Sequence, residues 1–280
     1  MRVPFPALGS LLVVALLAAC APEPVRTAVP LRASDVAAGP GAARLAAAAE
    51  REWRDWGSIA VEGWPIALER TPDATPDLFD RLMTYWGATR DGPGIVAAHR
   101  RFRDEIGAAP VETASLDPAA DIGFRQMPVN VGISSYNTPA WSAAFVSHVV
   151  ERAGIGEFRP SSAHAMYLDP LLARAAADPE GAPFRPHAPA EYAPRPGDLV
   201  CFDRSASPLL HWTERLAEPG RSRPMHCDVV TAVRGGSLDL IGGNVLDVVL
   251  RRRVATDAAG RLETPPLDRP PFLLVMENRR

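Results

Sequence analysis

The sequence contains no lysine, so arginine carries all of its permanent side-chain positive charge. Its 30 basic residues are slightly outnumbered by 33 acidic ones, which gives a formal net charge of -3. Proteins that bind nucleic acid, or that bind membranes through charge alone, usually carry a basic surplus. The composition therefore predicts no nucleic-acid partner. The lack of lysine, in a chain rich in Ala, Pro and Arg, gives no indication of function.

The hydrophobic run near the N-terminus, Leu8 to Ala19, is too short to span a bilayer as a stable helix. It follows Arg2 and ends in L-A-A-C, so the region resembles a bacterial lipoprotein signal with its lipobox. The resemblance implies cleavage before Cys20, lipidation of that cysteine and attachment to the periplasmic face of a bacterial membrane, expected to be the outer one. We assign residues 1–20 to the signal peptide and the Pro/Ala-rich residues 21–41 to a flexible tether.

Cysteine is scarce, with three in the whole chain. The two beyond the lipobox, Cys201 and Cys227, belong to a compartment that permits disulfides, and the sequence leaves open whether they pair or remain buried thiols. Potential metal ligands are scattered: Cys201, His211, His226 and Asp228. Because the chain has no close ligand pair of the C-x-x-C or H-x-x-x-H kind, we expect no metal and no cofactor.

The spacing of hydrophobic residues differs between the first and the second half of the folded part of the chain. Helical spacing of apolar and aromatic residues predicts helices over Ala42 to Val61, after Thr75-Pro76-Asp77, and over Ile95 to Ile106. Short β-branched runs between Gly and Pro clusters predict the strands Asp198–Asp203, His226–Val233, Leu238–Ile241, Val245–Val254 and Phe272–Glu277. Helices followed by strands predict an α+β fold, with helices packed on one face of an antiparallel sheet. We divide the chain into a helical part, 42–135, and a core, 136–280.

One further helix is expected around His164 and Tyr167. Pro170 should interrupt it, and the Pro-rich run from Pro179 to Pro196 should form a long surface loop. His164 itself is open to two interpretations, since it can be a second catalytic group that lines a cleft or a structural histidine on a helix.

The stretch from Tyr136 to Ser147, Y-N-T-P-A-W-S-A-A-F-V-S, is the first candidate for chemistry. Thr138 and Pro139 predict a helix cap and first helical position, which places Ser142 in the opening turn. The free N–H groups and the dipole of a helix start can support a nucleophile and an oxyanion site. The alternative is a buried amphipathic helix that begins with a small residue.

A hairpin over residues 225–244 is the second candidate. If Arg234-Gly235-Gly236 forms a three-residue loop, His226 pairs with Asn244, and an amide beside an imidazole fixes the ring's tautomer and direction. A two-residue turn would shift the register by one and move Asn244 to the opposite face. Asp228, on the same face as His226, would then be the better group to orient the base or to bind a substrate amine.

The order of these motifs resembles the papain-like cell-wall hydrolases of the NlpC and CHAP type. P-A-W-S-A-A-F-V-S is followed by R-P-G-D-L-V-C-F, H-C-D-V-V and I-G-G-N, whereas those enzymes carry a cysteine at the serine position. The serine form, with S-S-A-H after it and a lipobox before it, is more similar to the uncharacterised bacterial lipoproteins grouped as domain of unknown function 2272. The similarity covers Trp86 and residues 136–253.

The resemblance implies a papain-like α+β domain with Ser142 as nucleophile, His226 as base and Asn244 as orienter. It implies a hydrolase of amide bonds in cell-wall peptides, with peptidoglycan or envelope peptides as partners. A serine hydroxyl keeps its proton until attack, whereas a cysteine at a helix start can ionise. A catalytically silent module that binds peptidoglycan or an envelope protein is therefore the alternative. Five more residues are candidates to line the cleft or bind substrate: Tyr136, Asn137, Trp141, His164 and Asp228.

Overall fold

A computed structural model describes residues 39–68, 71–108 and 131–280. The expected signal peptide with Cys20, nearly all of the expected tether and most of the irregular stretch after α3 lie outside the described residues. Within the described part, no helix is long and apolar enough to cross a membrane.

The helices follow the predicted order, with different ends. The described helices are α1 (Pro40–Asp55), α2 (Pro76–Gly87), α3 (Gly92–Ala108), the short 3-10 helix η1 (Ile133–Tyr136), α4 (Ser142–Arg152), α5 (His164–Ala177) and α6 (Trp212–Arg215). Thr75 caps α2 as predicted, because its hydroxyl accepts a hydrogen bond from the Leu78 N–H at 3.3 Å.

Two helix boundaries differ from the prediction. The first helix stops at Asp55, since Gly57 and Ser58 take φ values of 89° and 59°, which a continuing helix does not allow. Pro170 does not end α5 but lies inside it. The loss of one helical hydrogen bond there is offset by packing, because Leu168 and Leu171 on either side are buried in the core.

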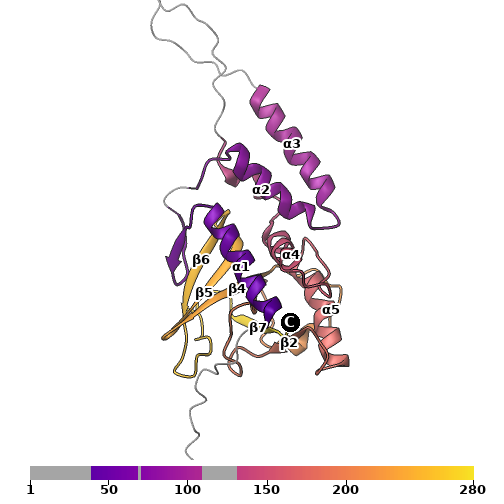
Figure 1. Ribbon diagram of the computed structural model, residues 1–280, viewed down its shortest axis with the longest axis vertical. Coiled ribbons are helices and arrows are strands. Elements are labelled where there is room, and N and C mark those ends of the chain that lie inside the picture. The colour runs from indigo at the N-terminus through magenta and orange to yellow at the C-terminus, as the bar shows by residue number, and fades with distance from the viewer. Residues whose placement is uncertain (1–38, 69–70, 109–130) are drawn as a thin grey trace, which may run out of the picture. The chain divides into compact units, whose positions relative to one another are not determined.

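In the described residues, seven strands form one mixed sheet in the order β1-β6-β5-β4-β3-β7-β2, which confirms the α+β class (Figure 1). The strands are β1 (Ala60–Glu62), β2 (Phe184–His187), β3 (Leu199–Asp203), β4 (Met225–Arg234), β5 (Ser237–Val245), β6 (Val248–Ala255) and β7 (Phe272–Asn278). The sequence predicts an antiparallel sheet, but β1 pairs parallel with β6. β2 lies inside the predicted Pro-rich loop, and Pro186 is tolerated there because β2 is an edge strand.

The two faces of the sheet carry separate hydrophobic cores. Alternate residues of β3 point to opposite faces, so Cys201 joins the larger core and Phe202 joins the smaller one. The larger core lies beneath the helices, where α1 contacts β4, β5 and β6, and α4 contacts β4 and β5 (Figure 1). Cys201 and Cys227 are direct cross-strand partners and form a disulfide, which settles the choice that the sequence left open.

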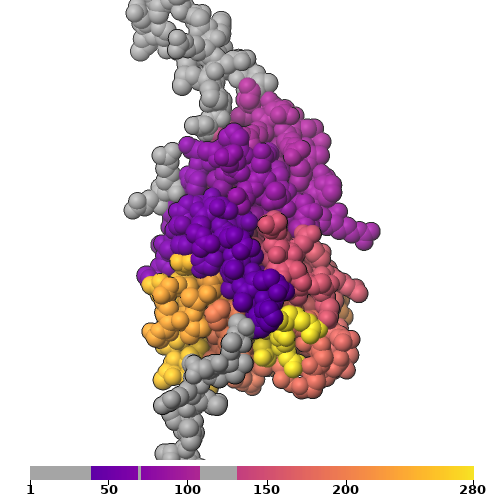
Figure 2. Space-filling view, in the orientation of Figure 1, coloured from indigo at the N-terminus to yellow at the C-terminus, as the bar shows by residue number. Residues whose placement is uncertain are grey.

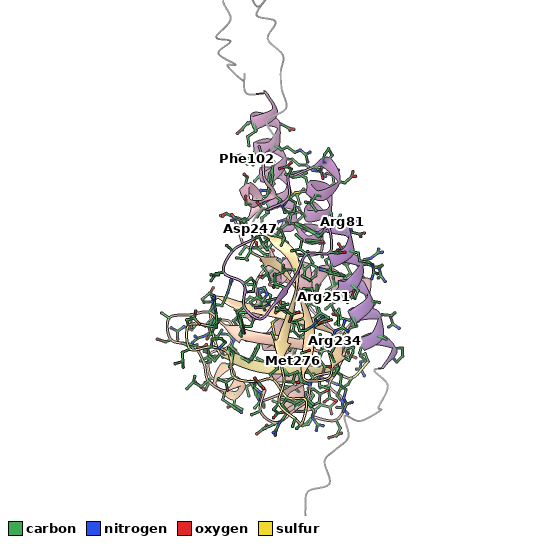
Figure 3. All side chains as sticks on the ribbon, turned by 90° about the vertical axis from the view of Figure 1, so that its left-hand side faces the viewer. Arg81, Phe102, Arg234, Asp247, Arg251 and Met276 are labelled. Atoms are coloured by element: carbon green, nitrogen blue, oxygen red, sulfur yellow. A yellow bond between two sulfur atoms is a disulfide. The ribbon has the colours of Figure 1, made fainter. Side chains whose placement is uncertain are left out.

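Helix α1 is fixed to the sheet at both of its ends. At its start, the Ala42 N–H donates to the Arg280 carbonyl at 2.8 Å, and Figure 2 shows the C-terminal residues in yellow beside the indigo helix. Gly197 has φ 93°, and a Cβ there would lie 2.3 Å from the Ala42 carbonyl oxygen. Farther along, Arg251 of β6 (Figure 3) forms an ion pair with Glu50, with 2.5 Å between Nη2 and Oε1. The Arg251 Cζ atom lies 3.4 Å from the centroid of the Trp53 ring.

Candidate active site

Ser142 is the first residue of α4, so the sequence placed it correctly in the opening turn. The predicted cap is wrong, because Trp141 occupies the N-cap position and its carbonyl accepts the Phe145 N–H at 2.9 Å. The Thr138 hydroxyl instead donates to Asn137 Oδ1 at 3.0 Å, in the segment before the helix. The Ser142 N–H belongs to the first turn, whose donors have no partner within the helix.

The histidine that contacts Ser142 is His164 of α5, not His226. Ser142 Oγ lies 2.7 Å from His164 Nε2, and His164 Nδ1 lies 2.5 Å from the Tyr167 hydroxyl. Burial lowers the pKa of His164 well below its ordinary value, and the nearby His226 and Arg204 lower it further. The ring is therefore neutral near pH 7. With Nε2 accepting from the serine, Nδ1 carries the proton and donates to Tyr167.

His226 lies beside this pair, with its ring centroid 5.5 Å from that of His164. Its Nε2 is 2.8 Å from Asp228 Oδ1, so this nitrogen is not free to contact Ser142. Burial alone would raise the pKa of the Asp228 carboxyl, but the Arg252 guanidinium bound to its other oxygen, together with His226, holds that pKa below its usual range. Asp228 therefore stays ionised. It orients His226, which is the role that the sequence offered it as the alternative to Asn244.

Asn244 does not orient His226. The hairpin closes with the two-residue Gly235-Gly236 turn, since Arg234 pairs with Ser237. A bulge between Val230 and Ala232 then shifts the pairing by one residue, back to the register that a three-residue loop would give. A second irregularity between Gly242 and Val245 then turns the end of β5, where Asn244 has φ 54°. The side-chain oxygen of Asn244 is buried and has no hydrogen-bond partner in the described residues.

The two glycines of the I-G-G-N motif allow β5 to lie very close to β4 on one side and to α4 on the other. A Cβ on Gly242 would lie 1.8 Å from Asp228 Oδ1 and 2.9 Å from His226 Nε2. A Cβ on Gly243 would lie 2.4 Å from the Phe145 Cβ of α4. Because side chains alternate along a strand, one glycine makes room for the His226 cluster and the other for the helix that carries Ser142.

Three of the candidate cleft residues make their contacts with residues outside the Ser142 site. Tyr136 and Trp141 are buried in the core, where Tyr136 packs on Phe79 at 4.9 Å and Trp141 stacks on Trp56 at 5.2 Å between ring centroids. Asn137 is half-buried, and its amide donates to Asp247 Oδ1 at 3.1 Å. Among the candidates, the structure thus gathers only His164, His226 and Asp228 around Ser142.

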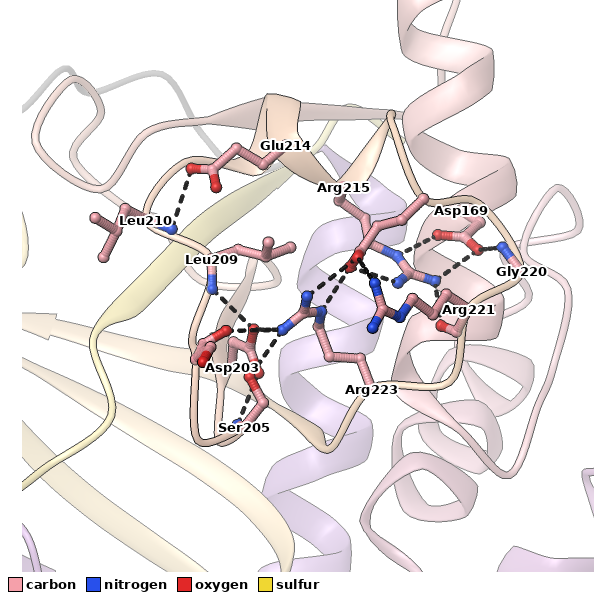
Figure 4. A network of polar contacts seen from close by, with 12 residues as sticks. Asp169, Asp203, Ser205, Leu209, Leu210, Glu214, Arg215, Gly220, Arg221 and Arg223 are labelled. Carbon is pink, nitrogen blue, oxygen red and sulfur yellow. Dashed lines mark hydrogen bonds and ion pairs between the residues drawn. The ribbon is translucent and has the colours of Figure 1, made fainter.

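An arginine network connects the two elements that carry these histidines (Figure 4). Arg215 is fully buried and binds both oxygens of Asp169 on α5, at 2.7 and 2.8 Å. Arg223, just before β4, binds Asp203 at 2.8 Å and Glu218 at 2.6 Å. Bidentate and charge-assisted contacts of this kind fix geometry as well as energy. The network therefore helps to fix the position of His164 relative to His226. No sequence motif indicated this network.

The site is nearly closed to solvent. Ser142 and His164 are each 4% exposed and His226 is 3% exposed. Within the described residues, no group of three His, Cys, Asp or Glu side chains is arranged to hold a metal ion. The site therefore holds a serine hydroxyl against a neutral imidazole, beside a buried ion pair and with little exposure to solvent.

A family model described as an uncharacterized protein conserved in bacteria (DUF2272) matches residues 104–276, more than half of the chain. The matched range includes the residues of the site: Ser142, His164, Tyr167, His226, Asp228 and Arg252. No curated protein and no solved structure matches the chain.

Proposed function

The chain belongs to the DUF2272 family of uncharacterised bacterial proteins, and we propose that it is a serine hydrolase of amide bonds in cell-wall peptides. Ser142 is the nucleophile and His164 is the general base. The observation that carries this proposal is the 2.7 Å contact between Ser142 Oγ and a neutral His164 Nε2 at the first turn of a helix. That contact lies within the roughly 2.6 to 3.2 Å that general-base catalysis requires.

The reaction proceeds by acyl transfer. His164 Nε2 takes the hydroxyl proton as Ser142 Oγ attacks the amide carbonyl carbon, and the N–H of Ser142 contributes to stabilising the oxyanion. The protonated His164 then gives its proton to the leaving amine, which yields an acyl-serine. Water, deprotonated by His164, attacks this ester, and the acid is released as Ser142 Oγ takes the proton back from His164. Throughout, Tyr167 accepts the Nδ1 hydrogen bond and keeps the ring in one orientation.

Asp228 and His226 act on His164 without touching the reacting atoms. The negative charge of Asp228 raises the pKa of His164, although burial, His226 and the Arg204 guanidinium lower that pKa by more. His226, held by Asp228, packs against the His164 ring and limits its rotation. Both are therefore positioning residues in this proposal.

Sequence features support the location and the class of substrate. The L-A-A-C motif at Cys20 supports a lipid anchor at the periplasmic face of a bacterial membrane, where peptidoglycan is accessible. The order of the Ser142, Cys201, His226 and Gly242 motifs supports a papain-like arrangement. In this version of the site, a helix histidine replaces the strand histidine as the base.

A second candidate function follows from burial, because Ser142 is only 4% exposed. A silent module would keep the Ser142, His164 and Tyr167 contacts as a buried polar network that stabilises one arrangement of α4 and α5. It would bind peptidoglycan or an envelope protein through other surfaces.

Digestion of purified peptidoglycan by the full-length protein separates the two functions. We expect peptide fragments with new carboxyl ends, detected by mass spectrometry, and a fall on the order of 10⁶-fold or to background with Ser142→Ala. Ser207→Ala, at an exposed position, is the matched control and should retain activity. A folded wild-type protein that binds peptidoglycan without releasing fragments would reject the hydrolase and support the silent module.

A further inference from the structure

Arg204 lies at the end of β3, on the side of the sheet that carries His226. It follows the last residue of the strand, and the antiparallel ladder continues there, since the Arg204 N–H donates to the Pro224 carbonyl at 2.7 Å. Within the ladder, Phe202 pairs with His226, and their ring centroids lie 5.1 Å apart. Because side chains alternate along a strand, Arg204 continues on the face of Phe202 and His226.

The charge of Arg204 acts on both histidines of the candidate active site. Burial lowers the pKa of His164 and of His226, and the Arg204 guanidinium lowers both further. Partial burial lowers the pKa of Arg204 itself, whereas nearby Asp228 raises it and Arg252 lowers it. The guanidinium therefore lies close enough to interact with the charged groups of the site, although the residue as a whole is exposed to solvent.

Arg204 has no counter-charge of its own. Asp228 is the carboxylate that acts on it, but His226 binds one oxygen of Asp228 and Arg252 binds the other. Within the residues that the structure describes, the Arg204 side chain forms no hydrogen bond or ion pair, whereas Arg223 and Arg252 both bind carboxylates. The site therefore carries a positive charge that is accessible to solvent and that no carboxylate of the described chain neutralises.

We propose that Arg204 binds a carboxylate of the substrate, close to the amide bond that Ser142 attacks. This inference rests on the proposed hydrolase function and adds to it a class of substrate, peptides with a free carboxylate near the scissile bond. A guanidinium binds a carboxylate through two parallel N–H···O bonds, which fix orientation as well as adding affinity. The carboxylate can be the C-terminus of the peptide or an internal one, since both offer the same two oxygens.

Three synthetic stem peptides of peptidoglycan distinguish these sources. The parent, L-Ala-γ-D-Glu-L-Lys-D-Ala, has two free carboxylates, and each of two analogues has one of them replaced by an amide. Binding to the full-length Ser142→Ala protein, which cannot form an acyl-serine, is measured by calorimetry. One analogue should bind about tenfold more weakly than the parent, because its charge-assisted pair is lost. That analogue identifies the carboxylate that Arg204 binds.

Three further variants localise the effect, each made in the Ser142→Ala protein. Arg204→Gln should remove the preference, so that the parent and the weaker analogue bind equally, and Arg204→Lys should keep part of it. Arg101→Gln, at an exposed position of α3, removes the same charge elsewhere and should leave the preference unchanged. A parent peptide that does not bind, equal binding of all three peptides, or a preference that survives Arg204→Gln in the folded protein would overturn the proposal.

Cleavage by the protein with Ser142 intact separates this inference from the proposed function. Binding that depends on Arg204, without cleavage of any peptide, would support the carboxylate site and reject the hydrolase. Cleavage of the parent and both analogues with equal kcat/KM would support the hydrolase and reject the role of Arg204.

Discussion

Ser142 and His164 are 22 residues apart and come from different helices, yet they are joined by a 2.7 Å contact. The local pattern predicted that the serine lies in the opening turn, although it placed the cap at Thr138 instead of Trp141. It did not predict the partner, since that depends on how α4 and α5 pack. His226 has the residue type and the strand that the family resemblance required, but Asp228 already occupies its Nε2.

Burial of His164 gives a prediction for the pH dependence of stability. Its pKa is lowered in the folded state, so below the unfolded value of about 6.5 the unfolded chain binds more protons. The stability associated with this group is fully present above pH 6.5 and is lost as the pH falls toward the folded pKa. We therefore expect the urea-derived free energy of unfolding to decrease from pH 7 to pH 5, and to decrease less in His164→Phe. An equal decrease in the two proteins would contradict this assignment.

Strand β5 shows why the register could be only partly predicted. The sequence cannot distinguish a three-residue loop from a two-residue turn at Gly235 and Gly236, and the turn that forms is the shorter one. The bulge between Val230 and Ala232 then compensates for it, because burial of the strand's apolar side chains fixes which face points inward. Two strands were missed for related reasons, since β1 has three residues and β2 contains proline.

The close approach at Gly242 is testable with one methyl group. Gly242→Ala would put a Cβ 1.8 Å from Asp228 Oδ1, so the carboxylate and His226 must move. We expect a loss of about 1 to 3 kcal/mol in unfolding free energy, as for other overpacked sites. Gly235→Ala is the control in the same hairpin, since its Cβ would meet nothing within 4 Å, and it should change stability by less than about 0.5 kcal/mol. Equal effects on urea unfolding would show that the approach is not restrictive.

Across the whole molecule, the order of helices and strands could be predicted more fully than the contacts between them. The change from helical spacing to β-branched runs is a local property, so the α+β class followed from it. The Arg252 to Asp228 pair and the Arg215 to Asp169 pair join segments 24 and 46 residues apart, and charge alone does not select such partners. These buried pairs hold the site together and required the three-dimensional structure.

Membrane attachment is a prediction about the complete chain. The apolar run before Cys20 is too short to anchor the protein by itself, whereas acyl chains contribute about 0.8 kcal/mol per buried CH₂. Cys20→Ser should therefore release the protein from the membrane fraction or leave it with its signal uncleaved. Cell fractionation with mass analysis of the N-terminus measures both. Normal processing together with unchanged membrane attachment would rule out Cys20 as the anchor.

The nucleophile assignment is tested most directly by reaction of the full-length protein with a fluorophosphonate. Such a reagent phosphonylates a serine, with loss of fluoride, only when a neighbouring base removes the hydroxyl proton during attack. Mass spectrometry should find the adduct on Ser142, and His164→Ala should abolish it in a folded protein, whereas Asn244→Ala should not. Absence of the adduct from the wild type, or labelling that persists without His164, would contradict a Ser142–His164 catalytic pair.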